Sequence, residues 1–453
     1  MFKKILIANR GEIAVRIIRT CKKMNIMTVA VYSEADHLAP FVKEADEAYL
    51  LGGPRPQDSY NNIEKIIEIA KLAQCEAIHP GYGFVSENAK FAERCLEESI
   101  IFIGPKPEVI EKMGSKIQAR KTMKEASLPL VPGISFPLKD VEEAAIEADK
   151  IGYPIMLKAS AGGGGIGMGA VHNENELRKA FAGHQKRAET FFNNNEMFLE
   201  KLIENPRHIE IQVLADHYGQ AVYLGERECS IQRRNQKVIE EAPSPIVDEE
   251  TRRAMGSAAV KAALAIGYEN AGTFEFIMDE AKNYYFLEMN TRLQVEHPIT
   301  EEITGIDIVE QQIKIASGEK LGFLQDDVTL QGHAIEARLY AEDPKTFFPT
   351  PGKITVIELP NEPYIRHDIG VKAGSTITPF YDGMFAKLIV TGKNRSECIE
   401  HLQFALEHYR VEGIKTNIPM VQAVVQHEEF LKGNTSTGFV NQFYLNKEGS
   451  NVR

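Results

Sequence analysis

The chain has 453 residues, which at roughly 150 residues per domain suggests about three domains. Hydrophobic residues make up 43% of it and charged residues 26%, which is enough apolar sequence to bury a large core without disulfides. The formal net charge of −12 argues against a general nucleic-acid binder. Any site for an anion must therefore be a local basic pocket in an acidic protein.

Cysteine usage and hydropathy indicate the compartment. The 5 cysteines are scattered and form no CxxC pair, which argues for a reducing environment and against a structural zinc site. The apolar run at residues 5–8 is too short for a signal peptide, and no stretch is long enough to cross a bilayer. We expect a cytoplasmic protein that binds no membrane and no nucleic acid.

The first quarter of the chain alternates strands with helices. Strands are expected at residues 3–8, 28–33, 76–80 and 100–105, and helices within 9–26, 63–72 and 89–99. Such alternation predicts parallel βαβ units in a first domain that ends near residue 113. The loop at residues 9–11 lacks GxGxxG, so a dinucleotide site is not indicated.

From about Gly114 the pattern changes. Helices are expected at residues 116–126, from 174 and at 252–266, and strands at 153–160, 198–204, 207–216, 272–279 and 284–291. After Ser317, short strands with Gly and Pro turns precede a helix at 396–409. These features predict a central domain at 114–317 and a third, α+β domain at 318–453.

A glycine run, GGGGIGMG, occupies residues 162–169. It could be a flexible surface linker, but linkers are usually flanked by polar sequence. This run follows a predicted strand that carries Lys158, which favours a loop whose backbone N–H groups close over phosphates. It is not a Walker A motif, since no Lys-Ser/Thr pair follows at the required offset.

The two strands at 272–279 and 284–291 predict a hairpin that carries carboxylates. A turn at residues 280–283 would set Glu275 opposite Glu288 and Ile277 opposite Phe286. Opposed carboxylates repel, unless a divalent cation lies between them, and Asn290 offers an amide oxygen on the same face. The alternative is a solvated sheet face. We favour a Mg²⁺ site that accompanies a nucleotide.

The segment after this hairpin, NTRLQVEHP, continues the polar alternation. If it stays extended, Arg292, Gln294 and Glu296 share one side, where they could hold a small anion and supply a base. A surface ion pair between Arg292 and Glu296 is the alternative. Further residues that could neutralise phosphates or an anion are Lys116, Lys158, Lys201, His208, Lys237 and Arg338. Each of these alone is more often a solvated charge, and His208 is equally compatible with a core position.

Taken together, these segments resemble the biotin carboxylases, the ATP-grasp components of acetyl-CoA carboxylase and related enzymes. The strings that carry the resemblance include HPGYGFVSEN, GGGGIGMG, NPRHIEIQV and EMNTRLQVEHPITE, and the match covers nearly the whole chain. The resemblance implies an α/β, ATP-grasp fold. Its parts are an N-terminal Rossmann-like (preATP-grasp) domain at 1–113, an ATP-grasp domain at 114–317 with a glycine-rich lid at about 131–203, and a C-terminal biotin carboxylase domain at 318–453.

The resemblance also implies a reaction. ATP, bicarbonate and biotin on a separate biotin carboxyl carrier protein would give carboxybiotin, ADP and phosphate through carboxyphosphate. Two metal ions, Mg²⁺ or Mn²⁺, would take part. The expected partners are that carrier, carboxyltransferase subunits and a second copy of the chain, in acetyl-CoA carboxylase and fatty acid synthesis. The alternatives are a subunit of a pyruvate or propionyl/acyl-CoA carboxylase, another ATP-grasp carboxylate–amine ligase, or a non-enzymatic scaffold.

Site residues are carried over from the family by position. Those implied for ATP are Lys116, Lys158, Gly164, Gly165, Glu200, Lys201, Leu202, Ile203, His208, Gln232, Lys237, Glu275 and Glu288, and those for metal are Glu275, Glu288 and Asn290. Those implied for bicarbonate and biotin are Lys237, Arg292, Gln294, Val295, Arg338 and Tyr82. Glu296 would be the base, assisted by Arg292, Arg338 and Lys237.

Three positions depart from the common family pattern. Ile166 and Gly169 stand in the glycine run where many members carry arginine, and Asn235 stands where His is frequent. Lid and nucleotide contacts at these positions are therefore in question.

Overall fold

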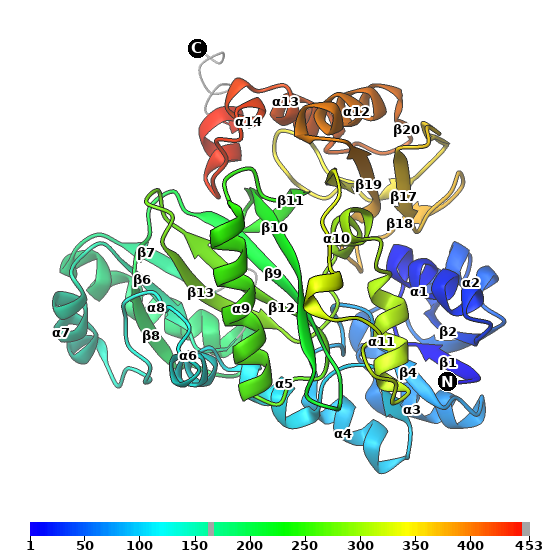
Figure 1. Cartoon of the computed structure of the whole chain (residues 1–453), viewed down its shortest axis with the longest axis horizontal. Helices are drawn as coiled ribbons and strands as arrows, with labels where there is room; N and C mark the ends of the chain where they lie inside the picture. The colour runs from blue at the N-terminus through cyan, green and yellow to red at the C-terminus, as the bar shows by residue number, and fades with distance from the viewer. Residues whose placement is uncertain (162–166, 446–453) are drawn as a thin grey trace.

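The computed structural model describes residues 1–161 and 167–445 (Figure 1). Gly164, Gly165 and Ile166 lie outside these ranges. Within them, every helix is too short or too polar to cross a bilayer.

The N-terminal part is built on a five-stranded parallel sheet, which confirms the predicted βαβ units. Its strands, in the order β3-β2-β1-β4-β5, are β1 Lys4–Ile7, β2 Met27–Ser33, β3 Glu47–Gly52, β4 Ala77–His79 and β5 Ile101–Phe102. Its helices are α1 Gly11–Lys23, α2 Pro40–Glu44, α3 Ile63–Leu72, α4 Ala89–Glu97 and α5 Pro107–Gly114. The strand order reverses between β1 and β4, and crevices in such sheets open at the carboxyl ends of these strands.

An eight-stranded antiparallel sheet forms the centre of the molecule, in the order β13-β12-β9-β10-β11-β14-β19-β17. The strands are β9 Arg207–Ala215, β10 Ala221–Arg233, β11 Gln236–Ala242, β12 Asn270–Met278, β13 Tyr284–Asn290, β14 His333–Tyr340, β17 Ile365–Ile369 and β19 Met384–Gly392. The pairing of β11 with β14 carries the sheet across the boundary expected at residues 317–318. Side chains from both sides of that boundary can therefore meet on one face.

A smaller lobe lies at the left of Figure 1. Its three-stranded sheet, in the order β7-β6-β8, consists of β6 Ile155–Ala159, β7 Gly169–Val171 and β8 Met197–Lys201. Helices α7 Val141–Ile151 and α8 Glu174–Phe192 pack against it around an apolar core of its own. Helix α6 Lys116–Glu125 lies beside β13.

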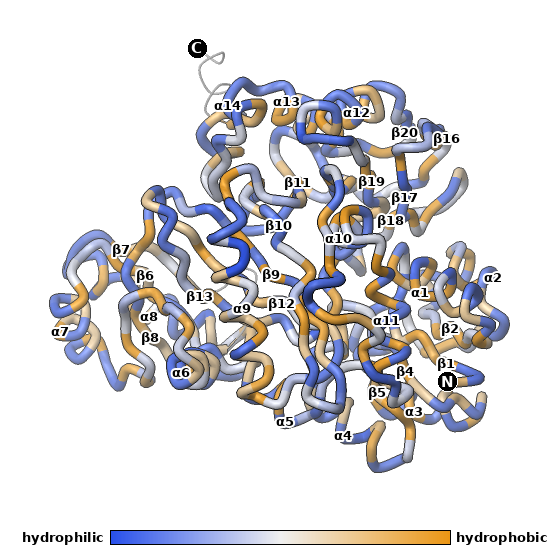
Figure 2. The backbone as a smooth tube through the Cα atoms, in the orientation of Figure 1, coloured by the Kyte–Doolittle hydropathy of each residue, from blue (hydrophilic) through white to orange (hydrophobic). Residues whose placement is uncertain are grey.

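The remaining elements lie outside the three sheets described above. They are α9 Glu249–Ala265, α10 His297–Thr304, α11 Ile308–Ala316, α12 Arg395–His408, α13 Ile418–Val425, α14 Glu428–Leu431, β15 Gly352–Lys353, β16 Val356–Glu358, β18 Thr376–Ile377, β20 Arg410–Glu412, short 3₁₀ turns at Glu34–Asp36, Pro56–Asp58 and Gln325–Asp327, and a π-helical turn at Val440–Leu445. Figure 2 shows hydrophobic and hydrophilic residues mixed along α9, which packs on β9 and β10 with one face.

The carboxylate hairpin confirms one predicted pair and corrects another. Glu275 lies opposite Glu288, as predicted, but Ile277 lies opposite Tyr285 and Phe286 opposite Phe276. The reason is a β-bulge between Glu275 and Phe276, which adds a residue to one strand. Phe286 consequently packs in the apolar core.

Candidate active site

One cavity of about 1260 Å³ lies between the N-terminal sheet, the small lobe and the central sheet. Its walls include the following predicted residues: Tyr82, Lys116, Lys158, Glu200, Lys201, Leu202, Ile203, His208, Gln232, Lys237, Glu275, Glu288, Asn290, Arg292, Gln294, Val295 and Arg338. Glu296 lies directly behind the wall, in contact with Lys237 and Arg338. Segments far apart in the sequence thus converge on a single site.

Two lysines mark the end of the cavity toward the small lobe. Lys158 on β6 forms a buried ion pair with Glu200, which also pairs with the buried Arg120. Lys116, at the start of α6, lies 3.3 Å from the carboxylate of Glu288. Cations paired with carboxylates beside a large cavity suit a polyphosphate that arrives with a metal ion.

Lys201 differs from the basic role considered for it. Its ammonium donates to the backbone carbonyls of Gly152 at 2.9 Å and Tyr153 at 3.0 Å. The charge is therefore directed into the small lobe, and only the rest of the residue faces the cavity. Lys201 is therefore removed from the cations predicted to neutralise phosphates or a small anion, because its ammonium binds the carbonyls at residues 152–153.

Glu275 and Glu288 form the candidate metal site. Glu275 is buried and accepts hydrogen bonds from Asn290 Nδ2 at 2.8 Å and Gln294 Nε2 at 3.3 Å, and its other oxygen lies 3.1 Å from His208 Nε2. Burial opposes its ionisation, but Lys237 and His208 together outweigh burial and hold the pKa of Glu275 below its usual range. Carboxylate oxygens are the hard ligands that Mg²⁺ or Mn²⁺ prefers, so Glu275 and Glu288 fit such an ion. The amide oxygen of Asn290 accepts from Arg292 Nη2 at 2.9 Å.

Lys237 on β11 joins three buried carboxylates. Its Nζ lies 2.6 Å from Glu210, 2.8 Å from Glu275 and 2.6 Å from Glu296. Burial disfavours the ammonium, yet these negative charges prevail and raise the pKa of Lys237 well above its ordinary value. The lysine therefore stays charged and holds the carboxylates together.

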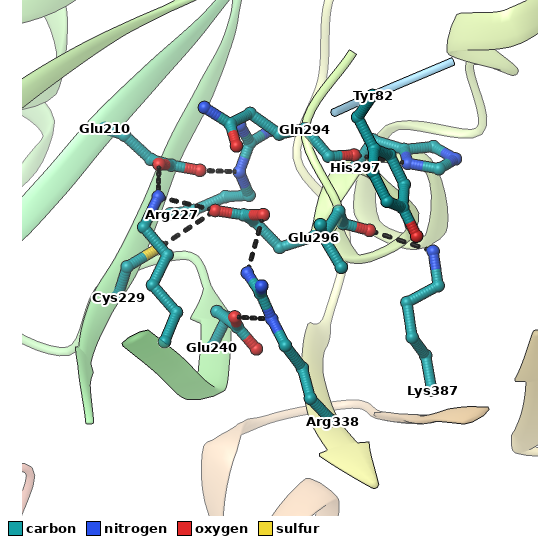
Figure 3. A network of polar contacts seen from close by, with 12 residues as sticks. Tyr82, Glu210, Arg227, Cys229, Glu240, Gln294, Glu296, His297, Arg338 and Lys387 are labelled. Carbon is teal, nitrogen blue, oxygen red and sulfur yellow. Dashed lines mark hydrogen bonds and ion pairs between the residues drawn. The ribbon is translucent and has the colours of Figure 1, made fainter. Parts of the chain in front are cut away.

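Glu296 is fully buried at the N-cap position of α10 (Figure 3). One oxygen accepts from Lys237 and the other from Arg338 Nη2 at 2.9 Å. Burial raises the pKa of this carboxyl, but Lys237, Arg338 and Arg227 lower it further than burial raises it, and the net pKa is well below the usual range. Glu296 is an anion clamped between two cations.

The segment between β13 and α10 is not extended, so that expectation is wrong. β13 ends at Asn290 and a helix begins at His297, with Pro298 in its first turn, where the fixed φ of proline favours helix. Arg292 and Gln294 still reach the cavity. The alternative ion pair between Arg292 and Glu296 does not form, because Arg292 Nε donates to Glu87 at 2.8 Å.

Tyr82 lies at the carboxyl end of β4, as the strand reversal predicts. Asn9 holds this loop by donating to the carbonyls of Pro80 at 2.7 Å and Tyr82 at 2.8 Å. The Tyr82 hydroxyl donates to Glu12 at the start of α1. Lys387 of β19 lies 3.2 Å from Glu12 and donates to the carbonyl of Val295 at 2.9 Å.

Two of the departures from the family pattern have a local explanation. Arg234 and Asn235 form the two-residue loop between β10 and β11, both with positive φ, where asparagine is favoured. A Cβ at Gly169 would approach His184 Nε2 to 2.7 Å, so glycine leaves room for this histidine. His208, which precedes Glu210 on the same strand face, accepts at Nδ1 from Gln232 Nε2 at 2.9 Å.

Three site residues were missed by sequence reasoning. Glu210 contacts Lys237, Glu87 contacts Arg292, and Lys387 contacts Val295. Glu210 is two residues from His208 in the same strand, and Lys387 is a lone cation in an apolar strand, so the sequence pattern could have indicated both. For Glu87, the only indication in the sequence was its place in the HPGYGFVSEN string.

Comparison with known proteins decides the family. Residues 1–110 match the family model of the biotin carboxylase N-terminal domain, 115–324 that of the carbamoyl-phosphate synthase L chain ATP-binding domain, and 336–442 that of the biotin carboxylase C-terminal domain. Biotin carboxylase 2 of Bacillus subtilis is 61% identical over 98% of this chain and 100% of its own. The chain belongs to the biotin carboxylase family. It is therefore an ATP-grasp protein and an ATP-dependent ligase, as the resemblance implied.

Other members of the family serve different final acceptors. One relative, a pyruvate carboxylase component of Methanothermobacter thermautotrophicus, is 53% identical over 98% of this chain and 90% of its own. The biotin carboxylase domain dimer of Hydrogenobacter thermophilus 2-oxoglutarate carboxylase, solved with MgADP and bicarbonate, superimposes with a TM-score of 0.96 at 50% identity, over 98% of each chain. Membership of the family thus leaves the acceptor open.

Proposed function

We propose that this chain carboxylates biotin on a separate carrier protein, with ATP and bicarbonate as the other substrates. Carboxybiotin, ADP and phosphate are the products. The observation that carries the proposal is Glu296, an anion held between Lys237 and Arg338 behind the wall of a cavity that Lys116 and Lys158 also line. A base, cations for a small anion and cations for phosphates thus meet at one cavity.

Glu296 is the proposed base toward bicarbonate. While Lys237 and Arg338 both bind its carboxylate, its basicity is low. A bicarbonate anion beside Lys237, Arg292, Gln294 and Val295 would share these cations, and the pKa of Glu296 would rise. Glu296 then takes the bicarbonate proton, and the dianion attacks the γ-phosphate of ATP to give carboxyphosphate and ADP.

Glu275, Glu288 and Asn290 are the proposed ligands of Mg²⁺ or Mn²⁺. The metal supplies charge neutralisation for the phosphates when it is bound. The MgADP in the Hydrogenobacter relative supports the use of Mg²⁺ and of ATP. Lys116 and Lys158 are the proposed cations for the phosphates, with Glu200, Lys201, Leu202, Ile203, His208 and Gln232 around the nucleotide.

Arg338 is the proposed contact for biotin. Carboxyphosphate breaks down to CO₂ and phosphate, and the phosphate takes the N1′ proton of biotin. The positive guanidinium stabilises the resulting enolate, with Tyr82 nearby, and N1′ of the enolate then adds to CO₂ to give carboxybiotin. Enclosure of the cavity by the small lobe would keep water from carboxyphosphate.

Acetyl-CoA carboxylase is the proposed assembly, with a biotin carboxyl carrier protein and carboxyltransferase subunits as partners. Homodimerisation is supported by the dimeric relative. The alternative is a pyruvate or propionyl-CoA carboxylase, and co-purification of the tagged chain with its carrier and transferase separates the two.

ADP release is the direct test of the reaction. Release that requires both bicarbonate and biotin is expected. ATP hydrolysis that ignores both, or turnover with an amine in place of biotin, would refute the proposal.

A further inference from the structure

Beside Arg338, two buried carboxyl groups face each other across two strands. Glu240 of β11 and Glu336 of β14 are partners in the antiparallel register, and both are 0% exposed. Directly opposed residues in such a pair have Cβ atoms about 4.5–5.5 Å apart, which is within reach of the two carboxyl groups. Neither group lines the substrate cavity.

The two carboxyl groups differ in their partners. Glu240 Oε1 accepts from Arg338 Nε at 2.6 Å, whereas Glu240 Oε2 has no hydrogen-bond partner within residues 1–161 and 167–445. In the same ranges neither oxygen of Glu336 has one. Buried carboxylates without donors are strongly disfavoured, so a proton is needed here.

The two cations nearest to the pair, Arg338 and Lys387, are already bound by other groups. Arg338 on the same strand is already bound by Glu240 and Glu296, and Lys387 on β19 by Val295, Glu12 and Asp368. Glu296 at the start of α10 adds a further negative charge, so ionised Glu336 would face two anions. Burial accordingly raises the pKa of Glu336 well above its usual range, against the opposing charge of Lys387.

We propose that Glu336 is a neutral carboxylic acid that donates its proton in a hydrogen bond to Glu240, and that the pair thereby positions Arg338. With one proton shared, Glu240 carries the only negative charge of the pair and holds Arg338 Nε. Nη2 of the same guanidinium remains directed at Glu296. Glu240 and Glu336 are positioning residues. The part of this inference that concerns turnover rests on the proposed function, whereas the protonation state does not.

An infrared difference spectrum of the full chain tests the protonation state without catalysis. The near-isosteric Glu336→Gln variant is compared with the unchanged protein at neutral pH. The expected difference contains a band of a protonated carboxyl group that shifts in D₂O. A difference that contains only carboxylate bands would overturn the proposal. The exposed Glu407 of α12 is the matched control, and Glu407→Gln should remove only carboxylate bands.

Thermal stability against pH gives a second readout. A carboxyl group with a raised pKa in the folded state costs stability progressively as the pH rises above its unfolded value. Glu336→Gln cannot ionise, so its melting temperature relative to the unchanged protein should increase from acidic to alkaline pH. A difference that stays constant with pH would contradict a raised pKa.

Turnover tests the positioning role. Glu240→Gln removes a charge-assisted hydrogen bond from Arg338, and kcat/KM for biotin should fall by roughly tenfold to a hundredfold while nucleotide affinity is kept. Glu336→Gln preserves the neutral partner, so its loss at neutral pH should be much smaller than that of Glu240→Gln. Equal losses in both variants, or an unaffected Glu240→Gln, would refute positioning even if the infrared result holds.

Discussion

Lys387 donates a hydrogen bond to the carbonyl oxygen of Val295 at 2.9 Å, although 92 residues separate them in the chain. The lysine is 0% exposed and also lies 3.2 Å from Glu12 of α1. Its ammonium thus connects the first helix, the last strands of the central sheet and the loop that precedes Glu296. Through this contact, three distant segments fix one wall of the anion site.

Replacement of Lys387 by methionine is expected to destabilise the protein. The change leaves Glu12 and Asp368 buried without this cation, and loss of one partner of a buried ion pair costs about 3–5 kcal/mol. Thermal or denaturant unfolding measures the loss. At temperatures where the variant stays folded, KM for bicarbonate should rise more than KM for ATP. Lys387→Arg keeps the charge and should recover part of the stability, and an equal loss in both variants would point to packing alone.

Glu296→Gln is expected to abolish turnover. Loss of a general base lowers kcat by about 10²- to 10⁴-fold, while the phosphate end of the cavity is unchanged. Steady-state kinetics and a nucleotide-binding titration measure the two effects separately. Glu302 lies on the same helix and pairs with Arg366, so Glu302→Gln serves as the control. If Glu296→Gln lost nucleotide binding as well, its role as base would be contradicted.

Glu288→Gln is expected to weaken metal binding. One of two opposed carboxylates is replaced by a neutral amide, and the Mg²⁺ concentration for half-maximal activity should rise at least about tenfold. A Mg²⁺ titration at saturating ATP is the measurement, and chelation should stop turnover. Glu280, exposed in the turn of the same hairpin, provides the control Glu280→Gln. An unchanged Mg²⁺ requirement in Glu288→Gln would remove this residue from the metal site.

Gly169→Arg is expected to destabilise the small lobe. The new Cβ meets His184 Nε2 at 2.7 Å, and such overpacking costs about 1–3 kcal/mol. Unfolding measurements check the loss, and a second change, His184→Ala, should reverse part of it. Gly183→Ala in α8 is the control, since its Cβ has no neighbour within 4 Å among the described residues. A Gly169→Arg variant as stable as the unchanged protein would refute the crowding.

Local elements were predictable where pattern and capping agree. The helix expected at residues 63–72 is α3, and Asn62 caps it by accepting from Lys65. The parallel units of the first quarter follow from the same short-range signals. The domain boundaries at 113 and 317 stay predictions.

Strands β10 and β11 were not predicted from periodicity. They form the middle of the central sheet, yet buried polar side chains interrupt their apolar pattern, among them Glu226, Arg227, Glu228, Glu240 and Glu241. A buried charge looks like a surface charge in a sequence, because its partner lies on another strand. For this reason, β10 and β11 could not be predicted from hydrophobic periodicity, although they carry residues of the candidate site.

The sequence by itself determined the family motifs, the opposed pair Glu275–Glu288 and the residue types available for phosphate, metal and base. Only the tertiary structure decided which charges meet: Lys201 turns to backbone carbonyls, Arg292 pairs with Glu87, and Lys237 joins Glu210, Glu275 and Glu296. The physical reason is that strand register is set by neighbouring residues, whereas electrostatic interactions depend on distances between segments far apart in the chain.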